Sequence, residues 1–111
     1  MTVKTWMISS NLAAGADDNP EHPNAIPADD KWAIDRFTFA DINTGDSKSS
    51  IYVLRFGTDI LEFGTVTGST DSIDVNEEIV GDGVKKINVL RYNTSGSTKK
   101  LPFKVKAKKR N

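Results

Sequence analysis

Residues 100–108 alternate between apolar and mostly basic residues. Every second position is apolar, at Leu101, Phe103, Val105 and Ala107. Because successive side chains of a β-strand point to opposite faces, this spacing predicts a strand with one buried and one charged face. Pro102 has no backbone N–H for a sheet hydrogen bond, which predicts that this strand lies at the edge of its sheet.

Similar strand patterns cover most of the chain. Runs rich in Val, Ile, Thr and aromatic residues, separated by clusters of turn-forming residues, occupy positions 2–8, 37–42, 50–56, 59–66, 72–80 and 84–92. No segment has a sustained helical period of apolar residues. The 111 residues correspond to one domain with one core. We therefore expect a single all-β domain over residues 1–111, a small β-sandwich of about seven strands, of jelly-roll or immunoglobulin-like type.

Two of these segments resemble each other. Residues 51–58 and 87–94 share the pattern Ile-x-Val-Leu-Arg-aromatic-x-Thr at an offset of 36 positions. We interpret them as the first strands of two related hairpins, 50–66 and 84–107. The alternative is a chance likeness between strands of similar composition.

Both of these strands are apolar on both faces. A strand with one solvent-exposed face would alternate with polar residues, so something must cover the second face. Either the chain's own N-terminal segment covers it, or another subunit does. Under the second interpretation we expect the interface to be formed by Tyr52, Leu54, Phe56, Leu90 and Tyr92.

Residues 9–31 interrupt the strand rhythm. They contain three of the four prolines, and their only sizeable aliphatic residues are Leu12 and Ile26. Long irregular connections are uncommon inside compact domains and are usually functional or mobile. Burial of so few apolar groups does not offset an ordering cost of roughly 1–2 kcal/mol per residue. We expect a loop or an extended arm that is mobile in the isolated subunit and becomes ordered on a neighbour.

Charge divides the chain in two. Residues 1–82 contain all 15 acids and five bases, whereas residues 83–111 contain ten bases and no acid. The C-terminal bases either lie beside acidic strands of the same fold or meet an acidic protein or a nucleic acid. The residues predicted to bind such a partner are Lys99, Lys100, Lys104, Lys106, Lys108, Lys109 and Arg110.

Catalytic chemistry has little support in the sequence. The single histidine, His22, lies in the proline-rich segment, there is no cysteine, and no phosphate-binding, zinc-protease or nucleophile-elbow motif occurs. We therefore expect no enzyme activity, no cofactor and no metal site. The acidic clusters at 17–22 and 71–78 carry oxygen ligands of the kind that calcium binds, but they lack the spacing of a calcium loop. A carbohydrate site is a further alternative, because four aromatic residues could stack on a sugar: Trp6, Trp32, Tyr52 and Tyr92.

The interpretation that accounts for most of these features is a non-enzymatic structural protein that acts by assembly. The acidic body, basic C-terminal strand and two-sided apolar strands favour packing against copies or partners, as in a decoration, cement or tail subunit of a virion or phage. The alternatives are a nucleic-acid-binding module using the C-terminal strand, and a calcium- or carbohydrate-binding module. The sequence contains no signal-peptide pattern and no apolar run of membrane-spanning length. We expect no membrane partner, and a location in a virion or in the cytoplasm of an infected host.

Overall fold

The structure is a computed structural model, and it describes residues 3–42 and 50–111. The described residues form strands and irregular segments, with no helix. In chain order the strands are β1 (Val3–Ile8), β2 (Asn11–Leu12), β3 (Asp17–Asp18), β4 (Lys31–Ala40), β5 (Ser50–Phe56), β6 (Asp59–Val66), β7 (Thr70–Val80), β8 (Ile87–Asn93), β9 (Lys99–Lys100) and β10 (Phe103–Lys109). The expected all-β sandwich is confirmed.

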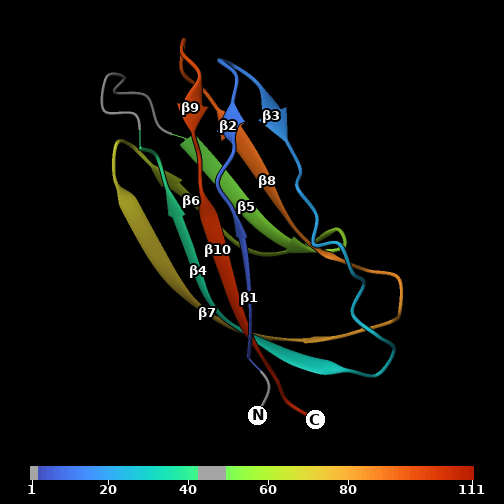
Figure 1. Cartoon of the computed structure of the whole chain (residues 1–111). Coiled ribbons are helices and arrows are strands. Elements are labelled where there is room, and N and C mark those ends of the chain that lie inside the picture. Colours follow the sequence, from blue (N-terminus) through green and yellow to red (C-terminus); the bar gives the residue numbers. More distant parts are fainter. Residues whose placement is uncertain (1–2, 43–49) are drawn as a thin grey trace.

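Two four-stranded antiparallel sheets form the layers of the sandwich (Figure 1). One sheet has the order β1-β10-β4-β7 and the other the order β3-β8-β5-β6, while β2 and β9 form a short separate pair. β4 begins at Lys31, six residues earlier than the predicted strand. In the first half of β4 the buried residues Trp32 and Ile34 alternate with less buried ones, as expected for a strand. The neighbouring Pro27 and aspartates are not typical of a strand, so this part was not predicted.

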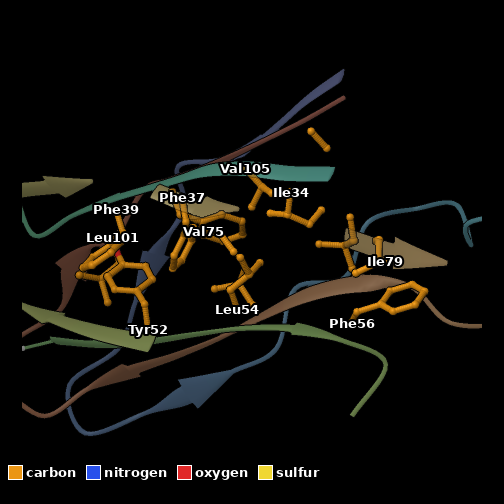
Figure 2. Close-up of a cluster of buried hydrophobic side chains, with 14 of the residues drawn as sticks. Ile34, Phe37, Phe39, Tyr52, Leu54, Phe56, Val75, Ile79, Leu101 and Val105 are labelled. Carbon is orange, nitrogen blue, oxygen red and sulfur yellow. The ribbon is translucent and has the colours of Figure 1, made fainter. Parts of the chain in front are cut away.

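The core lies between these sheets and is rich in aromatic rings (Figure 2). Phe37 and Phe39 of β4 pack against Tyr52 of β5, with ring centroids 6.1 and 5.0 Å from the Tyr52 ring. The Tyr52 hydroxyl donates to the backbone oxygens of Ala40, at 2.6 Å, and Pro102, at 3.2 Å. Burial of this hydroxyl raises the pKa of Tyr52, and its hydrogen bonds connect the two sheets at the centre of the core.

β10 is an internal strand, contrary to the edge position expected for the strand of the basic C-terminal segment, residues 99–111. It pairs with β1 on one side and with β4 on the other. Pro102 precedes the strand, and its carbonyl accepts a hydrogen bond from the Ala40 N–H at 3.1 Å. The proline therefore marks where the chain enters the sheet.

One of the two expected hairpins is present. β5 and β6 pair as an antiparallel hairpin over 50–66, as predicted. The expected hairpin over 84–107 is wrong, because β8 belongs to one sheet and β10 to the other. The repeated pattern is therefore not a repeated hairpin.

Candidate functional site

The face of β5 that the sequence analysis assigned to a partner is occupied by the chain itself. Tyr52, Leu54 and Phe56 are 0%, 0% and 5% exposed and point into the core between the sheets (Figure 2). These three residues were therefore assigned to the wrong face of the strand. The alternate residues Ile51 and Val53 are half-buried and lie on the outer side of the same sheet.

On that outer side, strand register brings apolar residues of three strands together. Phe63 of β6 lies beside Val53, and Val53 lies beside Leu90 of β8. In the next row Ile51 lies beside Tyr92. We call these five residues the apolar face. Phe63 is 66% exposed and the other four are half-buried, so Leu90 and Tyr92 lie on the outside as the interface hypothesis requires.

The 9–31 segment does not lie across this face. It runs along the free edge of β8, where the Asn93 N–H donates to Ala16 O at 3.0 Å and the Val89 N–H donates to Pro20 O at 3.0 Å. β3 pairs with β8 in the same position. The segment therefore extends the sheet sideways and leaves the apolar face partly exposed.

Arg91 of β8 fixes the 9–31 segment with a buried guanidinium group. It forms a two-pronged ion pair with Asp18, with Nε–Oδ1 2.9 Å and Nη2–Oδ2 2.6 Å. It also donates to the backbone oxygens of Ser10, at 3.1 Å, and Leu101, at 2.7 Å. The segment that we expected to need a neighbour has these partners within its own chain.

Lys99 is not available to a partner. Its side chain is fully buried and its Nζ lies 2.5 Å from Oδ2 of Asp41, which is also fully buried. The Ser50 hydroxyl donates to the same carboxylate oxygen at 3.2 Å. Lys99 therefore belongs to the interior, and its place in the predicted basic surface was wrong.

Two further bases of the predicted basic surface lie beside acids of the same chain. Lys108 Nζ is 3.6 Å from Asp35, and Lys109 Nζ is 3.5 Å from Asp30. Both pairs are partly exposed. The exposed members of the predicted set are Lys100, Lys104, Lys106 and Arg110. Only part of the predicted basic surface is thus presented to solvent, which weakens an interaction with a phosphate backbone.

The acidic clusters do not form a metal cage. Among residues 3–42 and 50–111, no group of three or more His, Cys, Asp or Glu side chains is placed to hold a metal ion. Asp18 of the first cluster binds Arg91, and Asp74 of the second accepts from Arg36 Nε at 3.1 Å. Within the described part of the chain, no helix has the length and hydrophobicity needed to cross a membrane.

Comparison with known proteins identifies the fold and nothing narrower. No family model matches the chain, and no curated protein matches it. Among solved structures, the chain is similar to the Yersinia pseudotuberculosis-derived mitogen, with TM-score 0.56, 7% identity, and 94% of this chain and 84% of that chain covered. It is similar to FlhE over 100% of both chains, with TM-score 0.52 and 12% identity. A likeness to a pilus protein of Bacillus endospore appendages has TM-score 0.49 and 15% identity, and covers 95% of this chain and 87% of that one.

Three residues of the apolar face, Ile51, Val53 and Phe63, were not among the predicted interface residues. A signal for Phe63 was present, because residues 61–63 alternate as Leu-Glu-Phe in a segment that was predicted to be a strand. Such alternation does not state which face is buried. Which face of β5 points outward follows from its register with β8, which the sequence does not give.

Proposed function

We propose that the chain is a non-enzymatic structural subunit that packs against further copies of itself through the apolar face. By analogy with compact, cysteine-free β-proteins of this size, the finer proposal is a decoration, cement or tail accessory subunit of a virion or phage particle. The single observation that carries the assembly role is the continuous row formed by Phe63, Val53 and Leu90 across three strands.

Exposure and chemistry both support this surface as an interface. Phe63 is 66% exposed, so a partner that covers this aromatic side chain removes much apolar surface from contact with water. Ile60 is 64% exposed and pairs with Arg55 at the β5–β6 turn, so it extends the apolar surface along the edge strand. Contiguous exposed apolar groups of this kind are typical of protein interfaces.

Replacement of Phe63 tests the proposal. Phe63→Lys keeps a long side chain that an exposed strand position tolerates, but it places a charge in the centre of the proposed contact. We expect the wild-type chain to self-associate with rising concentration in sedimentation experiments, and the variant to remain a folded monomer. Val84→Lys is the matched control, because Val84 is 77% exposed and lies outside the apolar face. A wild-type chain that stays monomeric at millimolar concentration would overturn the proposal.

The salt dependence separates assembly from the nucleic-acid alternative. Apolar association is maintained or strengthened by added salt, whereas binding to a phosphate backbone weakens steeply as salt rises. The sedimentation series is therefore repeated at low and high salt, with and without a single-stranded oligonucleotide. Binding of the oligonucleotide that is lost on replacing Lys104 and Lys106 by Ala, with self-association absent, would favour the alternative.

A further inference from the structure

β1 is the last strand of its sheet, so one side of it has no neighbouring strand (Figure 1). The Leu101 N–H donates to Ser10 O at 3.3 Å, and this pair continues the register in which β1 pairs with β10. Because hydrogen-bonded pairs alternate along an antiparallel ladder, Val3, Thr5 and Met7 direct their backbone N–H and C=O groups away from β10. Among the described residues, no backbone hydrogen bond reaches this side of β1 from another segment. We call this side the β1 edge.

The other long edges of the sandwich are irregular, and the β1 edge is not. The pairing of β7 with β4 contains a register shift, next to which Asn76 takes a positive φ of 52°. The pairing of β6 with β5 also contains a register shift. β1 pairs with β10 without a shift, contains no proline, and has Lys4 as its single charged residue. Irregular strands resist the addition of a further strand, so the β1 edge is the most suitable of the long edges of the described strands.

Lysines border the β1 edge on the outer side of the sheet. Lys106 of β10 lies beside Thr5, and Lys104 lies beside Met7. Both lysines are exposed, and neither forms an ion pair with an acid of the described residues. Two copies of β1 that paired would bring two such basic rows together, which costs free energy. A strand with acids on its outer side would instead meet opposite charge across the short Thr5 side chain.

The inner side of the β1 edge is apolar. The Trp6 ring is held by edge-on contacts with the rings of Phe103 and His22, with centroid distances of 5.0 and 5.7 Å. Trp6 also lines a pocket of about 220 Å³, whose lining includes Ile26 of the 9–31 segment. An apolar side chain on the inner side of an added strand would lie beside Trp6, and such cross-strand contacts with aromatic rings are favourable.

We propose that the β1 edge binds an extended segment of a partner protein in which acidic and apolar side chains alternate. The segment adds to the sheet antiparallel to β1, as every other strand of this sheet pairs. Its backbone bonds to Val3, Thr5 and Met7, its acids lie on the side of Lys106, and its apolar side chains lie on the side of Trp6. This proposal does not rest on the assembly role, because the apolar face lies on the other sheet.

The probe is the peptide acetyl-Glu-Val-Glu-Leu-Glu-Val-Glu-amide, added to a ¹⁵N-labelled chain. We expect saturable shifts of the backbone N–H signals of Val3, Thr5 and Met7, and slower exchange of these protons with solvent. A peptide with Lys in place of each Glu should bind at least about tenfold more weakly. The Glu peptide with an N-methyl group on its middle Glu keeps every side chain but loses a ladder hydrogen bond, so it should also bind at least about tenfold more weakly.

Variants of the chain separate the backbone and charge contributions. Thr5→Pro removes a donor on the free side of β1, so it should leave the pairing with β10 and the circular dichroism spectrum unchanged but abolish peptide binding. Lys106→Ala should weaken binding of the Glu peptide about threefold. Lys100→Ala is its matched control, because Lys100 is an exposed lysine on β9, away from the β1 edge, and it should change nothing. Phe63→Lys should bind the peptide as the wild type does, whether or not the apolar face assembles.

Three results would overturn the proposal. One is the absence of a saturable shift at about 1 mM Glu peptide. Another is equal binding of the N-methylated peptide, because the lysines would then attract acids without the addition of a strand. The third is protection of the Val3, Thr5 and Met7 N–H groups that rises with protein concentration in the absence of peptide, because a second copy would then occupy the edge.

Discussion

The buried ion pair between Lys99 and Asp41 gives a sharp test of the structure, because neither side chain has any exposed surface. Lys99→Met removes the cation that lies 2.5 Å from the Asp41 carboxylate, and Asp41→Asn removes the anion of the same pair. The double variant removes both charges of the pair, and the new amide oxygen still accepts from the Ser50 hydroxyl, which in the wild type donates to Asp41 at 3.2 Å.

The size of the effect follows from this burial. Removing one partner of a buried pair costs about 3–5 kcal/mol, whereas replacing both often costs little. A domain of this size has a free energy of unfolding of about 5–15 kcal/mol, so each single variant loses roughly a fifth or more of its stability. We expect the double variant to be more stable than either single variant by at least about 2 kcal/mol.

Urea unfolding followed by tryptophan fluorescence measures these differences, with the free energy of unfolding taken from the midpoint and slope of each curve. Lys104→Met is the control for loss of a lysine, because Lys104 is exposed in the same C-terminal region. Single variants within about 1 kcal/mol of the wild type would show that the pair is not buried. A double variant as unstable as the sum of the two single changes would show that the charges do not interact.

Three further changes test the core, the 9–31 segment and a close backbone contact. Arg91→Met removes the ion pair to Asp18, so amide exchange in residues 10–22 should accelerate more than in β5, measured by hydrogen-exchange mass spectrometry on the isolated chain. Burial raises the pKa of Tyr52 above its unfolded value of about 10, so its contribution to stability is complete below that pH and is lost as pH rises above it. Tyr52 ionisation at 295 nm, observed after the other tyrosine is replaced by Phe, should therefore coincide with unfolding. Gly81→Ala places a methyl group against Pro27 O, so it should cost about 1–3 kcal/mol in urea unfolding.

The fold class was predictable because alternation with a period of two recurs along the chain. Residues 50–56, 59–66 and 72–80 were predicted within two residues of their observed bounds. Such local signals depend on neighbouring residues and on turn chemistry between strands. The position of a strand within its sheet has no comparable local signal, so the internal position of β10 could not be found.

The candidate site was predicted on the correct strands but partly on the wrong face. The repeated pattern aligned Ile51 with Ile87 and so placed both on one side. β5 and β8 pair antiparallel, however, and Ile51 lies beside Tyr92 while Phe56 lies beside Ile87. Ile51 therefore points outward and Ile87 inward. When a strand is apolar on both faces, the register with its partner strand determines which face points into the core. Sequence spacing does not reveal that register.

The separation of charge along the chain has a structural explanation within one subunit. Arg91, Lys99, Lys108 and Lys109, all from the basic part, contact acids of residues 18–41. These four bases thus offset acids of the acidic part across the fold, and the most buried of these pairs, at Lys99 and Arg91, hold β9 and the 9–31 segment in place. Because these pairs use part of the basic charge internally, our proposal places the assembly role on apolar contact. That is the reason why a change at Phe63 tests the proposed function more directly than a change at any lysine.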